Sequence, residues 1–120
     1  MTEAAIQQQV RLALSRAGAA MFRNNIGAYT DQAGRVIKYG VCNPGGSDLI
    51  GWTPVVVTPA MVGTTVAVFT AVEVKTPSGR PTSQQLNFID QVIRAGGYAG
   101  IARAPGDVGA ILQTGVCGTR

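Results

Sequence analysis

The sequence predicts an α/β sandwich, because a strand-like segment in the second half of the chain is flanked by helical patterns. The expected order of elements is helix, several strands, helix, strand, helix. Residues 66–75 are mostly β-branched or apolar, which is typical of a buried central strand. A strand at 98–102 is expected to lie parallel beside it, since the helix between them supplies a crossover.

Length and composition favour one domain. The chain has 120 residues, enough for a single core, and we expect one domain over 1–120, with its core at 2–113 and a frayed tail at 114–120. No apolar run reaches about eighteen residues, so we expect neither a membrane span nor a secretory signal. Cys42 and Cys117 have no metal-ligand spacing and form no disulfide framework, which favours a reducing cytoplasm.

Charged residues are few, and this limits the available chemistry. Ten Lys and Arg against six Asp and Glu give a net charge of +4, which suits a polyanionic partner, although many basic domains bind no nucleic acid. Histidine is absent, which excludes Ser-His-Asp and Cys-His catalysis and histidine metal sites. The glutamates are Glu3 and Glu73, and the lysines are Lys38 and Lys75.

The first helix is expected from Thr2, its cap, to about residue 17, with Gly18 as its stop. Its apolar stripe includes Val10 and Leu14, and Glu3 lies on the same side in the first turn. An alternative reading of Glu3 is a carboxylate that the helix dipole merely favours.

Several short strands should follow. A strand is expected at 20–23, and the turn composition of 31–34 predicts a hairpin between 28–30 and 35–41. Arg35 and Lys38 on this hairpin could contact phosphates, or the hairpin could be a solvated ribbon. Further strands are expected at 47–50, which includes Asp48, and at 55–58, with a turn at 51–54 between them.

The second helix is expected at about 83–95, with Gly96 as its stop. Its core stripe is Leu86, Ile89, Val92 and Ile93. Gln85 falls on the inward side of the first turn. Because Thr82 and Gln85 also fit a capping box, structure alone could explain this glutamine. A last strand at 98–102 and a last helix at 105–113 complete the chain.

Two charges close the central strand. Side chains alternate along a strand, so Glu73 and Lys75 share one face, and the valines of residues 66–74 share the other. A salt bridge at the strand end is one explanation. Asp48 follows a glycine-rich loop among small or apolar neighbours, where an unpaired carboxylate is costly.

Asp48 and Glu73 together suggest a metal-dependent phosphodiesterase. Carboxylates are hard ligands that suit Mg²⁺, and a bound metal polarises phosphate and activates water. Lys75 could stabilise charge that develops on the phosphate. Glu3 could add a third carboxylate and Val74 a carbonyl, while Gln85 could hold the water or Lys75.

The sequence is similar to the VRR-NUC domain, a branch of the PD-(D/E)xK nuclease superfamily. The resemblance covers about residues 2–110. It is carried by Glu3-x-x-Ile6, Phe22-Arg23-Asn24-Asn25-x-Gly27, Gly46-Ser47-Asp48-Leu49, Val72-Glu73-Val74-Lys75, Gly79-Arg80-x-Thr82-x-x-Gln85-x-x-Phe88 and Gly96-Gly97-Tyr98-Ala99-Gly100. Ser47 departs from the proline in the superfamily's name, so the approach to Asp48 is expected to be less rigid.

The resemblance implies a restriction-endonuclease-like fold, a central mixed β-sheet flanked by helices, and metal-dependent cleavage of DNA. Asp48 and Glu73 would be metal ligands, Lys75 the catalytic lysine, Glu3 the helix carboxylate and Gln85 the accessory glutamine. Small viral and bacterial members resemble nucleases of branched DNA, sometimes homodimers that resolve four-way junctions, and a larger relative cuts flaps.

The leading interpretation is thus a Mg²⁺- or Mn²⁺-dependent, phage-encoded endonuclease acting on branched or flapped DNA, with a role in DNA repair. Phosphate contacts are expected chiefly from Arg80, with Arg23, Arg35 and Lys38 as further candidates and Arg11 and Arg103 as weaker ones. Two alternatives are a nucleic-acid-binding module on the same fold without cleavage activity, and a structural protein with a simple Glu73–Lys75 ion pair.

Overall fold

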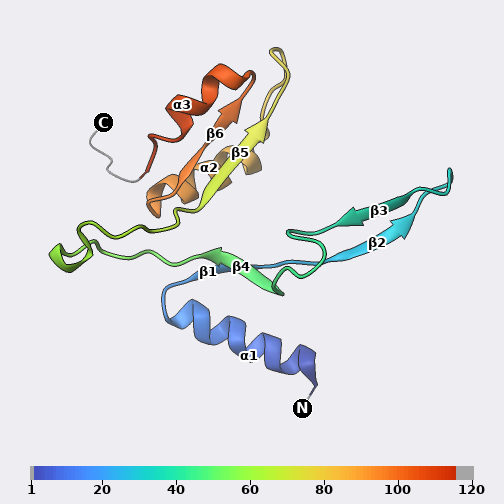
Figure 1. Ribbon diagram of the computed structural model, residues 1–120, viewed down its shortest axis with the longest axis horizontal. Helices are drawn as coiled ribbons and strands as arrows, with labels where there is room; N and C mark the ends of the chain where they lie inside the picture. The colour runs from blue at the N-terminus through green and yellow to red at the C-terminus, as the bar shows by residue number, and fades with distance from the viewer. Residues whose placement is uncertain (1, 116–120) are drawn as a thin grey trace. The chain divides into compact units, whose positions relative to one another are not determined.

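The structure is a computed structural model and describes residues 2–115 (Figure 1). The chain divides into two compact units, Met1–Thr53 and Pro54–Arg120, and each is described by itself. The single domain expected from the sequence stays a prediction. Most of the expected frayed tail, residues 116–120, lies outside the described residues. Thr114, the first residue of that tail, is anchored, since its Oγ1 accepts the N–H of Ala99 at 2.9 Å.

The first unit contains one helix and four short strands. Its elements are α1 (Glu3–Arg16), β1 (Ala20–Arg23), β2 (Gly27–Thr30), β3 (Val36–Tyr39) and β4 (Leu49–Trp52). As predicted, Thr2 caps α1, accepting the N–H of Ala5 at 3.1 Å, and Gly18 follows the helix at a φ of +94°. The predicted apolar stripe is covered only in part: Leu14 is half-buried, but Val10 is 43% exposed. A pair of four-residue strands is too short to cover a fourteen-residue helix.

The strands β1 and β4 pair antiparallel, from Ala20 opposite Trp52 to Arg23 opposite Leu49. The rings of Phe22 and Trp52 lie 5.3 Å apart between their centroids and help to hold the pair together. The strand predicted at 47–50 is observed as β4, which starts and ends two residues later, at Leu49 and Trp52. The predicted turn at 51–54 is wrong in its first half, because Gly51 and Trp52 belong to β4.

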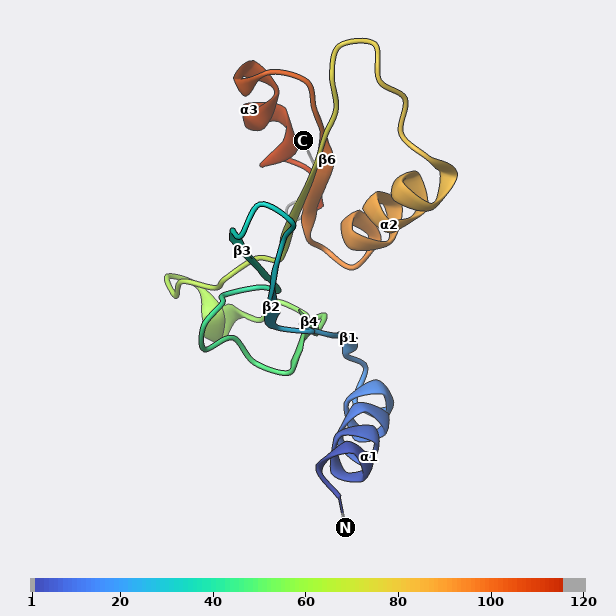
Figure 2. The same ribbon diagram turned by 90° about the vertical axis from the view of Figure 1, so that its right-hand side faces the viewer.

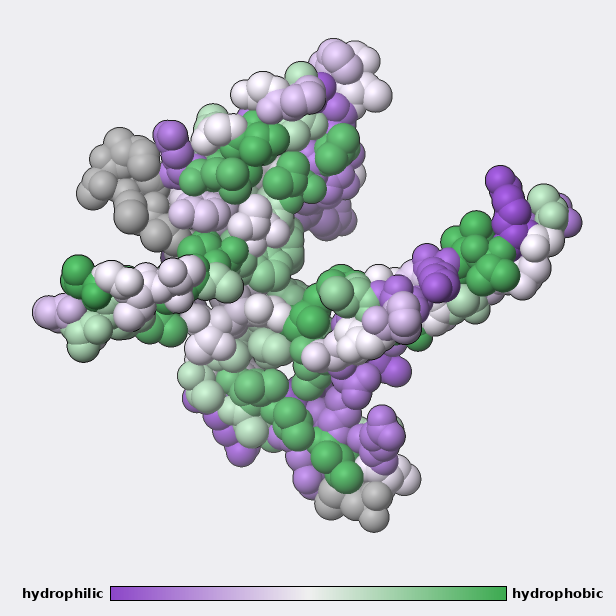
Figure 3. All heavy atoms as spheres, viewed as in Figure 1, coloured by the Kyte–Doolittle hydropathy of each residue, from purple (hydrophilic) through white to green (hydrophobic). Residues whose placement is uncertain are grey.

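The strands β2 and β3 form the predicted hairpin. Asp31 fixes its turn: Oδ1 accepts the N–H groups of Ala33 and Arg35, and Oδ2 accepts Arg35 Nε at 2.8 Å. These hydrogen bonds, chiefly the one from the Arg35 backbone, hold the pKa of the Asp31 carboxyl below its ordinary value. Tyr29 and Tyr39 lie across the hairpin with centroids 6.5 Å apart. Hydrophobic residues remain exposed along it (Figure 3).

The second unit is built around a parallel pair of strands. Its elements are the 3₁₀ turn Pro59–Met61, β5 (Thr70–Val74), α2 (Ser83–Arg94), β6 (Tyr98–Ala102), the 3₁₀ turn Pro105–Asp107 and α3 (Val108–Ile111). The predicted crossover is confirmed, because β5 pairs parallel with β6 and α2 connects them. Figure 2 shows α2 and α3 on opposite sides of β6.

Glycines at the start of β6 and within it let both helices approach closely: Gly97 directly precedes the strand and Gly100 lies in it. A Cβ on Gly97 would lie 2.7 Å from Cγ1 of Val92 on α2, and a Cβ on Gly100 would lie 2.8 Å from Cγ1 of Ile111 on α3. Val92 and Ala99 are each 1% exposed and Ile111 is 5% exposed, so the core of this unit lies around β6. No helix among residues 2–115 is long and apolar enough to cross a bilayer.

Several predictions in the second half of the chain are wrong. The central strand is only Thr70–Val74, whose five residues pair with the five residues of β6. Phe69, directly before it, still accepts the N–H of Tyr98 at 2.9 Å through its carbonyl. Residues 55–58 form no strand, and Val56 there is 86% exposed. Leu86, expected in the core, is 48% exposed, and the last helix begins as a 3₁₀ turn and continues only to Ile111.

The single central sheet expected from the sequence is not formed within the described chain. The strands pair instead as three separate two-stranded sheets. The segment between Trp52 and Thr70 forms no strand, so it adds none to the β5–β6 pair. The protein is thus a mixed α/β fold with small sheets, and a complete sandwich is not established.

Candidate functional site

The end of β5 presents Glu73 and Lys75 on one face, as the alternation of side chains predicts. Burial alternates along the strand: Ala71 and Glu73 are half-buried, whereas Val72 and Val74 are 45% and 75% exposed. Val72 pairs with Gly100, which lies against Ile111, so the valine side of the strand faces α3. Figure 3 shows hydrophobic residues gathered over α3 and beside β5.

Lys75 and Glu73 form an ion pair on the α2 side of the sheet. Lys75 Nζ lies 3.6 Å from Glu73 Oε2, and the two side chains are 20% and 32% exposed. Lys75 extends the strand ladder by one residue, because its N–H donates to the carbonyl of Ala102 at 3.1 Å. A rigid backbone thus fixes the positions from which both charges project.

Gln85 connects this pair to the start of α2. Its Nε2 donates to Glu73 Oε2 at 3.1 Å. Its Oε1 accepts the N–H of Thr82 at 2.9 Å, and its own N–H donates to Thr82 Oγ1 at 3.1 Å, which completes the predicted capping box. The capping box is confirmed, whereas the expected contact of Gln85 with Lys75 is replaced by one with Glu73. One amide group caps the helix with its oxygen and holds the carboxylate with its nitrogen.

Both contacts to Glu73 use the same carboxylate oxygen. Oε2 receives Gln85 and Lys75, while Oε1 accepts no hydrogen bond from the described residues. Neighbouring backbone groups on a strand point to opposite edges, so the carbonyl of Val74 is directed away from β6. A carboxylate oxygen and a backbone carbonyl near the strand end are the hard donors that Mg²⁺ and Mn²⁺ take, so this donor set fits such an ion.

Arg103 fastens the loop that follows Lys75. Its Nη1 donates to the carbonyls of Thr76 at 2.7 Å, Pro77 at 3.4 Å and Gly79 at 2.6 Å. This loop connects β5 to α2, so the contacts fix the segment that links Lys75 to Gln85. Arg103 was expected as a weak phosphate contact, and the structure places its guanidinium against backbone carbonyls instead.

We expect Arg103→Gln to lower the free energy of unfolding by about 1–2 kcal/mol, because a shortened neutral side chain cannot reach three carbonyls. Urea unfolding monitored by circular dichroism measures this. Arg94→Gln is the matched control, since Arg94 makes only an exposed ion pair with Asp90 at 2.8 Å. Equal destabilisation by both substitutions would contradict the fastening role.

Asp48 lies in the first unit, directly before β4. Its carbonyl accepts the N–H of Asn24 at 2.8 Å. The sequence placed Asp48 among apolar neighbours, but the residue is exposed, so the expected cost of a buried charge does not arise. The carboxylate makes no hydrogen bond or ion pair with residues 2–115, and backbone contacts alone define its position.

Glu3 is the first residue of α1 and is exposed. Its place beside the Thr2 cap fits the simple interpretation of a carboxylate favoured by the helix dipole. Glu3 and Asp48 belong to the first unit, while Glu73, Lys75 and Gln85 belong to the second. The structure therefore brings together the last three of the five predicted residues. Within either unit, the described residues contain no group of three acidic or cysteine side chains that could hold a metal.

The predicted phosphate-binding side chains fall into two classes. Arg23, Lys38 and Arg80 are exposed and pair with no carboxylate of the described chain. Arg35 is exposed too, but its guanidinium pairs with Asp31 at 2.8 Å, which reduces its charge toward an outside anion.

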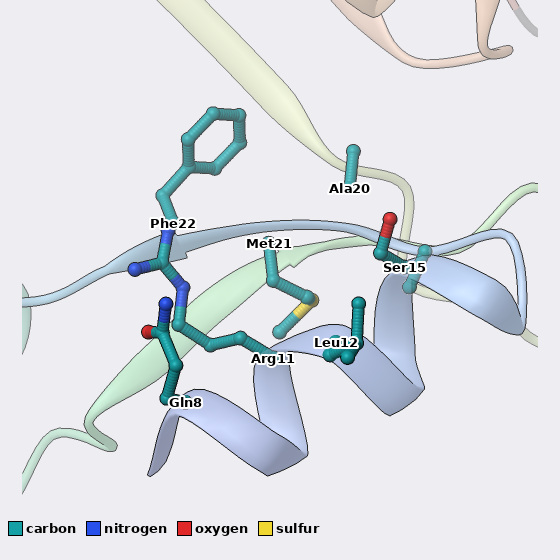
Figure 4. Close-up of a pocket in the computed structure, with 8 residues that line it drawn as sticks. Gln8, Arg11, Leu12, Ser15, Ala20, Met21 and Phe22 are labelled. Carbon is teal, nitrogen blue, oxygen red and sulfur yellow. The ribbon is translucent and has the colours of Figure 1, made fainter. Parts of the chain in front are cut away.

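A pocket of about 590 Å³ lies between α1 and β1. Figure 4 shows Gln8 and Arg11 rising from α1 toward Phe22, with Met21 pointing to the helix. No acidic residue lines this pocket, so it offers no carboxylate for metal binding or acid–base chemistry. None of the residues that line it is among the five predicted catalytic residues.

The sequence did not predict the supporting contacts of two residues. Arg103 holds the loop after Lys75, and Asn24 holds the segment before Asp48. Asn24 follows β1 and is 8% exposed, and its side chain bonds Val41 and Ser47. Asn24 stood within the motif that carried the resemblance, but nothing in its spacing indicated those partners. No signal in the sequence around Arg103 indicates its contacts.

Comparison with known proteins identifies one family. The VRR-NUC domain matches residues 3–105, which is nearly the whole chain and includes all five predicted site residues. No curated protein and no solved structure matches the chain. A match of this extent, together with the Glu73, Lys75 and Gln85 cluster, places the protein in a nuclease domain family: the chain belongs to the VRR-NUC family.

Proposed function

We propose that the protein is a divalent-metal-dependent endonuclease that hydrolyses phosphodiester bonds in DNA. The observation that carries the proposal is the arrangement around Glu73. Lys75 and Gln85 both contact Oε2, and Oε1 accepts no hydrogen bond from the described residues. A simple structural ion pair would not need a glutamine to fix the carboxylate from a second element. Family membership gives independent support.

The side chains have distinct proposed roles. Glu73, with the Val74 carbonyl, would hold Mg²⁺ or Mn²⁺, which when bound polarises the phosphate and lowers the pKa of water. Gln85 keeps the Glu73 carboxylate in one orientation. The ammonium of Lys75 is placed to stabilise negative charge that develops on the phosphate. Asp48 as a second ligand and Glu3 as the helix carboxylate keep the roles that the resemblance implies.

DNA would be held through its phosphates. Arg80 follows the loop that Arg103 fastens, and it is exposed, so it is the first candidate. Arg23 and Lys38 are the next candidates, whereas Arg35 is weakened by its pairing with Asp31. Binding through phosphates should weaken as salt concentration rises.

Branched DNA is the proposed substrate class, either a four-way junction or a flap. A homodimer would match the two-fold symmetry of a junction. A reducing compartment such as the cytoplasm is proposed because the sequence has no disulfide framework.

The proposal is tested by incubating labelled four-way junction, 5′ flap, splayed-arm and linear duplex DNA with the protein in Mg²⁺, Mn²⁺ or EDTA. We expect cutting with either metal, none in EDTA, and a preference for a branched substrate. Lys75→Ala, purified in parallel, should bind DNA without cutting and so excludes a contaminating nuclease.

Each outcome separates the candidate functions. Salt-sensitive binding to all substrates without cutting in any metal would favour the non-catalytic binding module. Cutting that survives EDTA would refute metal dependence, and equal cutting of linear and branched DNA would refute structure selectivity alone.

A further inference from the structure

Asn24 is a buried polar residue of the first unit, with 8% of its surface exposed. Its Nδ2 donates to the carbonyls of Val41 and Ser47, each at 3.0 Å, and its Oδ1 accepts the N–H of Val41 at 2.8 Å. Both amide protons and the amide oxygen are thus engaged. The partners also fix the orientation of the amide, because a flipped group would face two carbonyls with its oxygen.

These bonds connect the end of β1 to the segment that carries Asp48. The backbone N–H of Asn24 donates to the Asp48 carbonyl at 2.8 Å, while its side chain holds the preceding residue, Ser47. Two consecutive residues are therefore bound by one asparagine. Because the Asp48 carboxylate makes no hydrogen bond or ion pair with the described residues, its direction depends on this fixed backbone.

The loop before Asp48 is also tightly constructed. The N–H of Gly46 donates to the carbonyl of Cys42 at 2.6 Å, and Cys42 has a φ of +57°. A Cβ on Gly46 would collide with the carbonyl of Val41. Val41 is the same residue that Asn24 binds through both its N–H and its carbonyl. The loop therefore has one closely packed path, and Asn24 anchors it at both ends.

We propose that Asn24 is a positioning residue that holds Asp48 in place for binding a divalent cation. The inference rests on the proposed function, because the proposed function makes Asp48 a ligand of the metal ion. A carboxylate on a free loop would lose conformational freedom each time it bound, and that loss weakens affinity. Because Asn24 fixes the backbone of Ser47 and Asp48 in the folded protein, less conformational freedom remains to be lost when the cation binds.

The first test is Mn²⁺ titration of the full chain by calorimetry, without DNA. Removing a group that orients a metal ligand typically weakens affinity by roughly 10- to 100-fold, and we expect this for Asn24→Ala. Asn24→Asp keeps the size and the acceptor for the Val41 N–H but loses both donors, so it should show the same direction. Asn25→Ala is the matched control, because Asn25 is exposed and its side chain bonds none of the described residues.

A double-mutant cycle separates positioning from general damage. If Asn24 acts through Asp48, Asn24→Ala should weaken Mn²⁺ binding no further in a protein that already carries Asp48→Asn. Additive losses in the double variant would overturn the proposal. So would unchanged Mn²⁺ affinity in both Asn24 variants.

The unmodified protein supplies a second readout that does not depend on a variant folding. The Val41 N–H bonds to Asn24 Oδ1, whereas the Cys42 N–H has no partner among the described residues. By NMR, we expect the Val41 amide to exchange with solvent at least about tenfold more slowly than that of Cys42. Equal exchange in a protein that binds Mn²⁺ would overturn the Asn24 inference alone. Absence of Mn²⁺ binding by the unmodified protein would overturn the proposed function and, with it, this role.

Discussion

Glu73→Gln should reduce the rate of DNA cleavage by at least about 10³-fold and leave the fold intact. The metal is expected to supply several kcal/mol of transition-state stabilisation, and losing its charged ligand forfeits most of it. Glutamine has the same shape, and its amide oxygen can still accept the hydrogen bond from Gln85 that Glu73 Oε2 accepts at 3.1 Å. Single-turnover cleavage at saturating DNA measures the chemical step without a contribution from product release.

Asp90→Asn is the control for Glu73→Gln. Asp90 is also a carboxylate of the second unit paired with a cation, Arg94, but it lies on the exposed side of α2. The Asp90→Asn variant should cleave DNA at the same rate as the unmodified protein. Equal cleavage rates for Glu73→Gln and Asp90→Asn would contradict a role for Glu73 in the reaction. Equal melting temperatures for the two variants would show that a lower cleavage rate in Glu73→Gln does not come from unfolding.

Gln85→Glu should separate the two tasks of Gln85. Glutamate at this position of a capping box still accepts the N–H of Thr82, so α2 should keep its first turn. The new carboxylate, however, replaces a donor 3.1 Å from Glu73 Oε2 with a like charge. We expect cleavage to fall by about 10²-fold, which is the size of effect seen when an orienting partner of a metal ligand is lost.

Thr82→Ala tests the other half of the same arrangement. It removes the hydroxyl that accepts the Gln85 N–H but leaves the backbone N–H that binds Gln85 Oε1. Stability should fall by about 1 kcal/mol while cleavage stays near its original rate. Normal cleavage by Gln85→Glu, or an equal loss in Thr82→Ala, would show that Gln85 acts only as a cap.

Features with local causes could be predicted from the sequence. The starts of α1 and α2 follow from threonine caps, and their ends from Gly18 and Gly96, because each signal acts within one helical turn. Strand length could not be predicted in the same way. Residues 66–69 resemble Thr70–Val74 in composition, but only Thr70–Val74 pair in strand register with the five residues of β6. The same cause explains why 55–58 forms no strand.

The candidate site shows the same division. The alternation of a strand predicts Glu73 and Lys75 on one face, and helix periodicity predicts that Gln85 turns inward. That Gln85 binds Glu73 rather than Lys75 could not be predicted from this spacing. The supporting contacts of Asn24 and Arg103 were not predicted, because both side chains bind backbone carbonyls 17 to 27 residues away along the chain. Every residue type offers the same carbonyl, so no sequence pattern marks such partners.

Gln85 both caps α2 and holds the Glu73 carboxylate. The geometry of the candidate site should therefore depend on whether the first turn of α2 is formed or open. Helix ends open more readily than helix centres, and such openings occur without global unfolding. When the first turn of α2 opens, the amide of Gln85 leaves Thr82 and Glu73 together, since one planar group serves both. On heating, the protein should therefore lose activity reversibly at temperatures below its main unfolding transition. The weakest helix turn, rather than the core around β6, would then set the upper working temperature of the protein.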